Sequence, residues 1–430
     1  MRLNTKRAIL SSVLFAIFGI IIIILQPSSI TRYNPSGYPA YVPELTDSFE
    51  FYVEENRRRI RAALTEYDFS ENSAPFGPQY SLEKVVDMRS PYQILPSDDN
   101  CDETETSSRK GFLLVHGLSD SPYLLHNVAE SISAIYPCAL LRALLNAGHG
   151  TIPGDLANVR LEQWITIFEY GLSNLANETD ELYVVGYSNG SALALNHLIT
   201  HPDENIIDAL ILLSPGLKTA DERSMWTPYL RYIYKWIVQK SDRDAVKYES
   251  FATNAAAEFF ELTQAVIEPD FSTLTTPTLM VVSSEDTTID YKASVDFFCN
   301  KLTTQNSSLI LLVSHNNSEP LHRGCDGVQT RVTEFVNDRV VSYSHVGMTI
   351  PPDDMHYGID GNNPVCVSHE GFPDRFERCL NDDLTSVYAE NNFMDENGLF
   401  QGNIVRRTSF NPTYAEMISD IHCFIEKSCN

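Results

Sequence analysis

Residues 181–200 read ELYVVGYSNGSALALNHLIT, and this stretch decides how the chain folds. Glu181 to Tyr187 contain an apolar run that suits a strand buried on both faces of a parallel sheet. Ser191 to Thr200 are rich in alanine and leucine, which favours a helix. Only a few residues separate the two elements. The pattern Gly186-Tyr187-Ser188-Asn189-Gly190 therefore predicts a serine presented on a sharp strand-to-helix turn.

Similar apolar runs recur on both sides of this unit. We predict further buried strands at 111–115, 209–213, 278–283 and 309–314, and helices at 123–136, 292–302 and 412–425. Strands that alternate with helices predict an α/β fold with a mostly parallel central sheet and helices on both faces. Right-handed crossovers bring the carboxyl ends of such strands to one edge of the sheet, where residues that act together should lie.

Residues 216–275 lack a clear buried strand and are rich in aromatic side chains. We predict that they form a cap of two or more helices inserted over that edge, with a few of the aromatic side chains lining a pocket. The aromatic residues of this segment are Trp226, Tyr229, Tyr232, Tyr234, Trp236, Tyr248, Phe251, Phe259 and Phe260.

A serine on such a turn can act as a nucleophile if a base and an orienting carboxylate are near it. Asp286 follows the predicted strand 278–283 directly and is the best acid, whereas we expect Glu285 and Asp290 to be solvated surface acids. Two histidines compete as the base. His345 and His315 each end a short apolar run, and both satisfy the chain order serine, acid, histidine.

Backbone amides must also stabilise the negative charge that develops on a substrate oxygen. His116-Gly117-Leu118 follows the strand 111–115, and a loop folded back at Gly117 would bring the Leu118 amide beside the Asn189 amide. We expect this pair to form the oxyanion hole. For His116 we predict a structural role, as a hydrogen-bonding partner of its own loop.

Several motifs together resemble the α/β-hydrolase superfamily, and most closely its carboxylesterase and monoacylglycerol-lipase-like branch. The resemblance covers roughly residues 109–346 and the last helix. The motifs are Val115-His116-Gly117-Leu118-Ser119-Asp120-Ser121-Pro122, Gly148-His149-Gly150-Thr151-Ile152-Pro153-Gly154-Asp155-Leu156, Trp164, the serine turn, and Ser284-Glu285-Asp286-Thr287-Thr288-Ile289-Asp290.

The resemblance implies catalytic residues for this chain. It implies Ser188 as nucleophile, Asp286 as acid, and the Leu118 and Asn189 amides as oxyanion hole, with no metal or organic cofactor. The pair Ser344-His345 resembles the serine-histidine pair of that branch and favours His345 as base. His345 lies 59 residues beyond Asp286, farther than in most of the family, so an insertion before it must be assumed and His315 stays open.

The N-terminus predicts export. Arg2, Lys6 and Arg7 precede the uncharged run 8–25, which at about 1.5 Å per residue just spans a bilayer core. We predict a cytoplasmic tail at 1–7, a transmembrane signal anchor at 8–25, and an exported remainder, periplasmic or extracellular. A cleaved signal peptide and a core helix are the alternatives.

The next residues, 26–108, should form a Pro-rich tether and an N-terminal extension. We expect the tether at about 26–45 to be extended above the bilayer, and 47–67 to form an amphipathic helix packed on the domain surface. The hydrolase domain would then occupy 109–430, with the cap at 216–275 and a disulfide-bearing insertion at about 347–411.

The charge and the cysteine content of the chain bear on its binding partners and its disulfides. The formal net charge is −26, which argues against nucleic acid as a partner. Eight cysteines all follow the predicted anchor, and an even number in an exported chain suggests disulfides. Nearest-neighbour pairing gives Cys101–Cys138, Cys299–Cys325, Cys366–Cys379 and Cys423–Cys429, with some buried free thiols as the alternative. From the spacing of cysteines and histidines we expect no metal site.

The sequence thus predicts a membrane-anchored, exported serine hydrolase that cleaves small or lipid-like carboxylic esters, for example of monoacylglycerol type, through an acyl-enzyme. The same residues would serve an acyltransferase, or an amidase or peptidase. A non-catalytic binding protein with this fold is a further alternative. A structural envelope protein is another, but that interpretation does not explain why the chain contains the serine turn.

Overall fold

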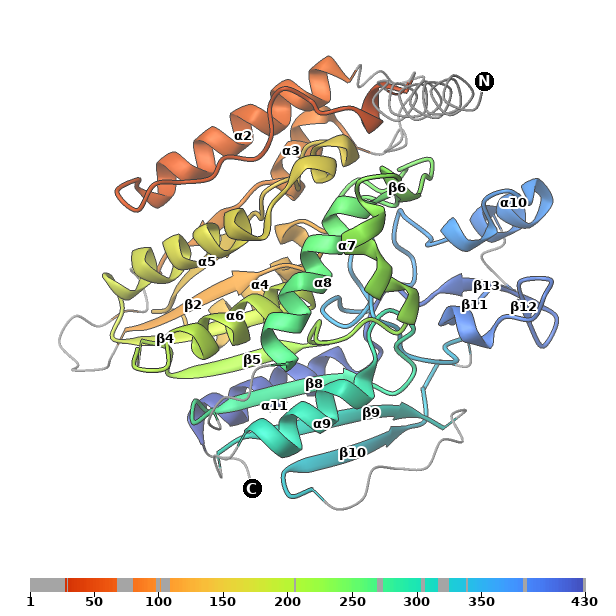
Figure 1. Ribbon diagram of the computed structural model, residues 1–430. Coiled ribbons are helices and arrows are strands. Elements are labelled where there is room, and N and C mark those ends of the chain that lie inside the picture. The colour runs from red at the N-terminus through yellow and green to blue at the C-terminus, as the bar shows by residue number, and fades with distance from the viewer. Residues whose placement is uncertain are drawn as a thin grey trace, which may run out of the picture.

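The core of the molecule is a sheet of eight strands, drawn in the computed structural model of Figure 1. The structure describes residues 28, 30–67, 80–97, 101, 109–204, 206–268, 274–302, 306–315, 325–337, 339–381 and 385–427. The strands lie in the order β1-β3-β2-β4-β5-β8-β9-β10, and only β1 is antiparallel to its neighbour. Their bounds are β1 (Tyr92–Ile94), β2 (Lys110–Val115), β3 (Leu140–Leu144), β4 (Glu181–Tyr187), β5 (Ala209–Leu213), β8 (Thr278–Ser283), β9 (Ser308–Ser314) and β10 (Val328–Thr333).

Helices cover both faces of this sheet, which confirms the predicted α/β arrangement. Successive residues of β2 point to opposite faces: Phe112 and Leu114 belong to one apolar cluster, and Leu113 and Val115 to the other. The first cluster lies against α4 (His126–Ile135) and α11 (Tyr414–Glu426). The second lies against α5 (Leu161–Ala176), α6 (Asn189–Thr200), α8 (Thr253–Ile267) and α9 (Tyr291–Lys301).

Besides the three-residue β1, two strands of the sheet are absent from the predicted set, β3 and β10. β3 carries the charged Arg142 in its middle, and this residue interrupts the apolar run although it is buried. β10 reads Val-Gln-Thr-Arg-Val-Thr and is only partly buried because it lies at the sheet edge. Both departures follow from sequence patterns that are weaker than those of the central strands.

The predicted helical cap at 216–275 needs correction. α8 belongs to the helical layer on the sheet, where Ala255, Phe259 and Leu262 are buried in the core. The remainder forms η4 (Glu222–Trp226), the single turn α7 (Thr227–Leu230), and a small ribbon of β6 (Trp236–Val238) and β7 (Phe251–Ala252). Apart from α8, the cap is therefore mostly loop.

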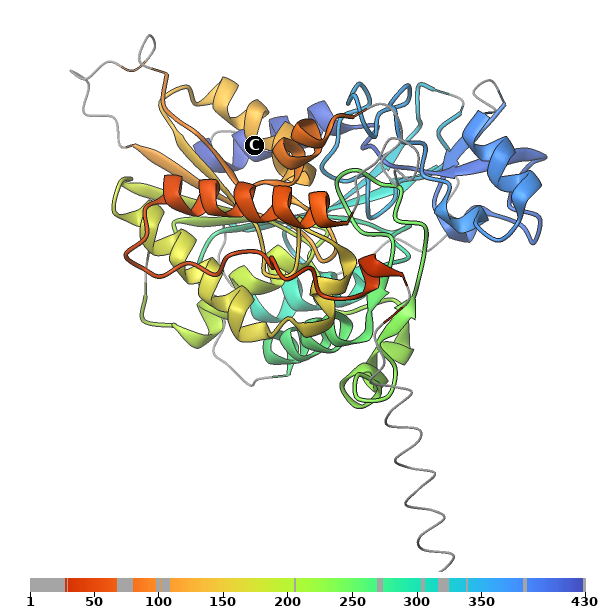
Figure 2. The same ribbon diagram turned by 90° about the horizontal axis from the view of Figure 1, so that it is seen from above.

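The N-terminal extension packs onto the domain instead of standing away from it. Beyond η1 (Thr31–Tyr33), Ser36 donates to the buried Asp155 through both its amide and its hydroxyl, at 2.8 and 2.7 Å. The expected extended tether at 26–45 is therefore wrong for residues 30–45. The predicted amphipathic helix is confirmed as α2 (Phe49–Glu66), which runs along the outside of the domain in Figure 2. Between residues 70 and 108 the polar composition predicts irregular structure or an added strand or two; β1 is such a strand, whereas α3 (Leu82–Arg89) is a helix that we did not expect.

The predicted anchor at 8–25 lies outside the described residues, so it stays a prediction. Within the part of the chain that is described, none of the helices is sufficiently long and apolar to cross a bilayer.

The C-terminal insertion forms a small lobe beside the sheet, visible in Figure 1 around α10. It contains α10 (Pro373–Asn381) and a three-stranded sheet in the order β11-β13-β12. These strands are β11 (Val387–Ala389), β12 (Leu399–Phe400) and β13 (Asn403–Arg407). The lobe also contains the short 3-10 helices η5 (Val367–His369) and η6 (Asn391–Phe393). Two further 3-10 helices, η2 (Pro122–Leu125) and η3 (Pro153–Asn158), belong to the main domain.

The predicted disulfide pairing is confirmed for three pairs. Cys101–Cys138, Cys299–Cys325 and Cys366–Cys379 are bonded, with Cα atoms 5.3, 5.8 and 5.9 Å apart. Cys423 is also in a disulfide, and its predicted partner Cys429 lies outside the described residues. The pair Cys366–Cys379 closes the C-terminal lobe on itself.

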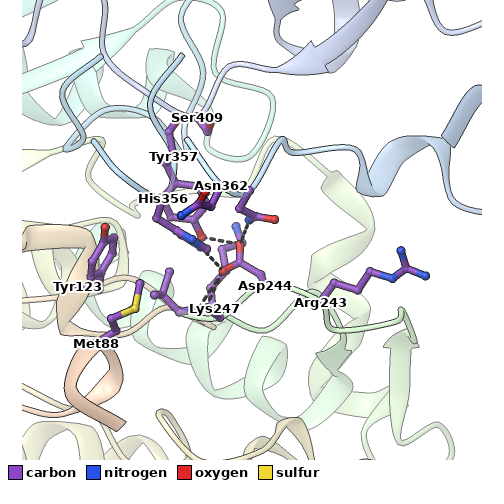
Figure 3. Close-up of polar contacts among 12 residues, drawn as sticks. Met88, Tyr123, Arg243, Asp244, Lys247, His356, Tyr357, Asn362 and Ser409 are labelled. Carbon is purple, nitrogen blue, oxygen red and sulfur yellow. Dashed lines mark hydrogen bonds and ion pairs between the residues drawn. The ribbon is translucent and has the colours of Figure 1, made fainter. Parts of the chain in front are cut away.

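A buried carboxylate fastens the cap to the C-terminal insertion. Asp244 accepts hydrogen bonds from His356 Nε2 at 3.1 Å, from the Tyr357 hydroxyl, and from Asn363 Nδ2 at 2.9 Å. Figure 3 shows the His356 and Tyr357 side chains pointing at it. The nearby Arg89 of α3 donates to the carbonyls of Ala245 and Thr151 at 2.6 and 2.8 Å. Three segments far apart in sequence are thus held at one point.

The Asp244 network generates the first prediction. Burial alone would raise the pKa of Asp244, but hydrogen bonding and charge from His356 outweigh it and lower that pKa below its ordinary 3.8. Asp244→Ala leaves several buried donors without an acceptor and should lower the free energy of unfolding by about 3–5 kcal/mol. Because the folded pKa is depressed, the difference from the wild type should be complete above about pH 4 and shrink as pH falls further.

Thermal denaturation between pH 3 and pH 8 measures this difference. Asp353→Ala, at an exposed aspartate three residues before His356, is the matched control and should stay within about 0.5 kcal/mol of the wild type. Equal melting temperatures for the two variants would show that the Asp244 network does not hold the cap.

Candidate active site

Ser188 lies on the sharp turn that the sequence predicts. Its backbone has φ 51° and ψ −112°, a conformation that costs an ordinary residue about 1–3 kcal/mol. The flanking glycines make the turn possible. A Cβ on Gly190 would overlap the Val115 carbonyl of β2, and one on Gly186 would lie 2.7 Å from the Ser191 amide nitrogen. The chain therefore passes close to itself on both sides of the serine.

The structure brings together the three residues predicted to act in sequence. His345 Nε2 lies 3.1 Å from Ser188 Oγ, and His345 Nδ1 lies 2.6 Å from Asp286 Oδ2. The second carboxylate oxygen of Asp286 accepts the amides of Thr288 and Ile289 at 2.7 and 2.8 Å. With Nδ1 donating to the carboxylate, Nε2 is left to accept the serine proton.

The alternative base does not reach this site. His315 is exposed at the end of β9, where its amide donates to the Thr333 carbonyl and its ring lies against Phe335. The loop after β10 instead returns across the sheet edge and places His345 beside the serine.

Contacts with three side chains or carbonyls outside it hold the His345 loop. Tyr187 donates its hydroxyl to the His345 carbonyl at 3.0 Å, and the Ser344 hydroxyl donates to the Thr408 carbonyl at 2.5 Å. Glu285 accepts the Tyr343 amide at 3.2 Å and the Ser314 amide at 2.8 Å. The residue that precedes Asp286 therefore positions the base.

Glu285 and Asp290 are not the solvated acids that we expected. Glu285 is buried, and its contacts tie β9 to the His345 loop. Asp290 caps α9 by accepting the Lys292 amide at 3.1 Å, and it pairs with Lys218 at 3.0 Å. A sequence signal existed for Glu285: an acid directly after a buried strand is placed among the ends of neighbouring strands.

Two neutral histidines shape the loop expected to form the oxyanion hole. His116 Nε2 accepts the Asn146 amide at 3.1 Å, and His149 Nε2 accepts the Ser119 amide at 2.9 Å. Each donates from Nδ1 to a carbonyl of its own loop. Burial lowers the pKa of His149 to about 4 and that of His116 well below its ordinary value. The predicted structural role of His116 is confirmed.

The predicted oxyanion amides are available. In the described part of the chain, neither the Leu118 nor the Asn189 N–H donates to another group, and Asn189 begins α6, where amides are free. Gly117 serves a different purpose from the one we expected. A Cβ there would collide with the Asp120 carboxylate and press on Ser188, whereas the positive φ of the loop, 67°, is at Ser119.

Asp120 is a site residue to which we assigned no role from the sequence. Its carboxylate packs against Gly117 on the side where the Ser188 Cβ also lies. It is 6% exposed, and within the described residues it makes no hydrogen bond or ion pair. Burial raises its pKa to about 6. Neither of its oxygens is fully buried, so a bound ligand beside the nucleophile would be able to donate a hydrogen bond to it.

We expected no metal site from the spacing of cysteines and histidines. His197 and His201 are nevertheless spaced as H-x-x-x-H, a common metal-ligand spacing, and Glu169 lies beside them. This cluster is at the far end of α6 from Ser188.

Comparison with known proteins finds hydrolases that are similar to part of this chain. Residues 106–312 match the family model described as serine aminopeptidase, S33. A thermostable monoacylglycerol lipase of Bacillus sp. (strain H-257) is 33% identical over 94 residues, a match that spans 22% of this chain and only 36% of that lipase.

Solved structures of lipases overlap this chain with low identity. The monoacylglycerol lipase of Paleococcus ferrophilus gives a TM-score of 0.41 at 15% identity, over 52% of this chain and 88% of its own. A soluble variant of the Saccharomyces cerevisiae monoglyceride lipase, solved with a substrate analog, gives 0.42 at 15% identity, over 52% and 81%.

The family match begins just before β2 and ends within β9, so it includes the serine turn, the loop after β2 and Asp286. The strand order and the turn at Ser188 agree with it. Over residues 106–312, just under half of its length, the chain is thus similar to the family described as serine aminopeptidase, S33.

Proposed function

We propose that the protein is a serine hydrolase that cleaves carboxylic esters through an acyl-enzyme. One observation carries the proposal: an unbroken hydrogen-bonded chain runs from Ser188 Oγ through the His345 ring to Asp286, at the turn between β4 and α6. A carboxylate, an imidazole and a hydroxyl in this order are what activation of a serine requires.

The reaction would proceed in two halves. As Ser188 Oγ attacks the ester carbonyl, His345 Nε2 takes its proton, and Asp286 stabilises the imidazolium through Nδ1. The Leu118 and Asn189 amides would donate to the oxyanion. His345 then returns the proton to the alkoxide leaving group. In the second half water attacks the acyl-enzyme with the same residue as base, and the acid is released.

The Asp120 carboxyl favours an ester whose alcohol part has a free hydroxyl. It lies beside Ser188, and a hydroxyl donor would supply the partner that the described residues do not give it. A glycerol monoester has such hydroxyls, and the Bacillus relative is named a monoacylglycerol lipase. Monoacylglycerols, or short lipid esters like them, are therefore our proposed substrate class.

A second candidate is an aminopeptidase. The family description names such an enzyme, and the Asp120 carboxylate would accept the ammonium group of a free N-terminus as readily as a hydroxyl. Amide cleavage would use the same serine and histidine. Acyl transfer to an alcohol would also begin with the same acyl-enzyme, and the two outcomes differ only in whether water or alcohol attacks it.

The second prediction tests the nucleophile and the base. With a fluorophosphonate probe the wild type should be labelled, and Ser188→Ala should lose all labelling. His345→Ala should lower the labelling rate at least 10³-fold, because the serine then lacks its base. His315→Ala is the matched control and should label like the wild type. Full labelling of Ser188→Ala, or a loss in His315→Ala, would contradict the assignment; no labelling of the folded wild type would favour a binding protein.

The third prediction concerns Asp120. Asp120→Asn should raise KM for a monoacylglycerol about tenfold, while KM for the nitrophenyl ester of the same acid, which has no hydroxyl, stays unchanged. The aminopeptidase is the correct function if the wild type prefers an aminoacyl nitroanilide and Asp120→Asn lowers the activity toward that substrate more than the activity toward the monoacylglycerol. Equal changes for all substrates would show that Asp120 does not contact the leaving group.

Stability gives an independent check on the same variant. The pKa of Asp120 is raised from 3.8 to about 6, so its contribution to stability is complete below about pH 4 and is lost as pH rises through about 6. Asparagine does not ionise, so Asp120→Asn does not lose stability as pH rises. The variant should therefore melt a few degrees above the wild type at pH 8, and the difference should vanish toward pH 4.

We also propose that the protein is anchored in a membrane by residues 8–25, with the hydrolase domain exported. The disulfides support an oxidising compartment. The cap supports a lipid surface, because it exposes an apolar patch made of Met225, Trp226, Tyr229, Leu230, Tyr232, Ile233, Tyr234 and Ile237. Tyr229 and Tyr232 are 70% and 73% exposed. Tyrosine and tryptophan favour the membrane interface.

This patch lies where the chain enters the described structure. The Tyr33 ring is 4.9 Å from the Trp236 ring, and the Tyr33 hydroxyl donates to the Lys240 carbonyl at 2.7 Å. The proposed anchor ends at Leu25, only eight residues earlier, so it would enter the bilayer beside the patch.

The fourth prediction follows from this placement. The full chain should stay in the membrane fraction after alkaline carbonate extraction, and a chain lacking residues 1–25 should be released. The released form should still float with phosphatidylcholine vesicles, and Tyr229→Ser/Tyr232→Ser should float several-fold less. Release of the full chain by carbonate would rule out a transmembrane anchor.

A further inference from the structure

A second cluster of ionisable side chains lies at the opposite end of α6 from Ser188. His197 and His201 are one helical turn apart, and Glu169 of α5 faces them. One ligand atom of each residue lies within 4.8 Å of the other two. At about 1.5 Å per residue the cluster is roughly 18 Å along the helix from the serine turn. It therefore plays no part in the proposed ester chemistry.

The polar atoms of the cluster face one another without bonding. His201 Nε2 is 4.0 Å from Glu169 Oε1, and His197 Nε2 is 3.6 Å from Glu204 Oε2, and both separations exceed a hydrogen bond. Ligands of a tetrahedral Zn²⁺ lie about 2.0–2.1 Å from the ion and hence about 3.4 Å from each other. The His197 and His201 rings are stacked, with centroids 4.6 Å apart and planes 25° apart, so binding of one ion would require both rings to turn as the ligand atoms come closer.

The two histidine rings differ in how they are held. The His201 Nδ1 lies 3.0 Å from the Thr200 hydroxyl, an interaction that orients the ring and leaves Nε2 toward Glu169. The His197 side chain is 7% exposed, and its Nδ1 has no hydrogen-bond partner among the described residues. A buried ring nitrogen without a partner is uncommon, and water or a bound ion would supply the missing partner.

We propose that Glu169, His197 and His201 bind one divalent transition-metal ion, for which Zn²⁺ fits best, with Glu204 or water as the fourth ligand. Two imidazoles and a carboxylate suit zinc and its neighbours, whereas Ca²⁺ and Mg²⁺ prefer oxygen ligands alone. The Glu169 and His201 side chains are 39% and 36% exposed, so an ion can enter from solvent. The bound ion would fasten α5 to the carboxyl end of α6 and would act on stability.

Calorimetric titration of the full chain with ZnCl₂ at pH 7.5, after chelator treatment and dialysis, tests the site. We expect one ion per chain with a micromolar or lower Kd, a melting temperature that rises with zinc, and no response to Mg²⁺ or Ca²⁺. Labelling of Ser188 by the fluorophosphonate should be the same with and without zinc, so the result is independent of the proposed hydrolase activity.

Two variants and a matched control make the test specific. Glu169→Gln and His201→Ala change partly exposed side chains and should fold, yet each should weaken zinc binding 10- to 100-fold. His126→Ala is the control, because His126 forms a comparable exposed pair with Glu130 on α4 and should bind zinc like the wild type. Absence of saturable binding, or equal binding by all three variants, would overturn the proposal.

Discussion

The rest of the structure depends on one strained turn. Ser188 adopts a positive φ at the junction of β4 and α6, and the chain tolerates it because two neighbours have no side chain. Without the glycines, α6 could not approach β2 closely enough to bury both elements. The cost of the conformation, about 1–3 kcal/mol, is small beside the burial of a central strand and a buried helix. Core packing therefore fixes the position of the serine hydroxyl.

The histidine that faces this serine is held by contacts far from it in sequence. Glu285 fixes the amide of Tyr343, Tyr187 holds the carbonyl of His345, and Ser344 is bonded to Thr408. Thr408 directly follows β13 of the C-terminal lobe. The last residue of that strand, Arg407, pairs with the buried Glu390 at 2.8 Å. The insertion after His345 is thus part of the support for the base, which explains why a long addition at this point leaves the geometry intact.

The same principle applies to the cap and the N-terminal extension. The cap has little regular structure of its own, and buried polar contacts hold it in place: Asp244 with the 356–363 loop, and Arg89 with two backbone carbonyls. The extension contributes Ser36 and Tyr33 at its contacts with the domain. Buried polar groups of this kind require all their partners, and they specify one arrangement of loops that apolar contact alone would leave loose.

The sequence by itself determined five strands of the central sheet, the serine turn and Asp286, because short local patterns decide them: apolar runs and glycine spacing. Pairing of cysteines close in the chain also predicted three disulfides. The sequence left His345 and His315 open, and it missed the roles of Glu285 and Asp120. It also expected an extended segment at 30–45 that in fact packs on the domain. The choice of base, the roles of Glu285 and Asp120, and the course of segment 30–45 all depend on contacts between loops and residues that are distant in sequence. Only the tertiary structure brings a histidine 157 residues beyond Ser188 to its hydroxyl, because that approach is set by the packing of the whole sheet edge and not by any local preference of the chain.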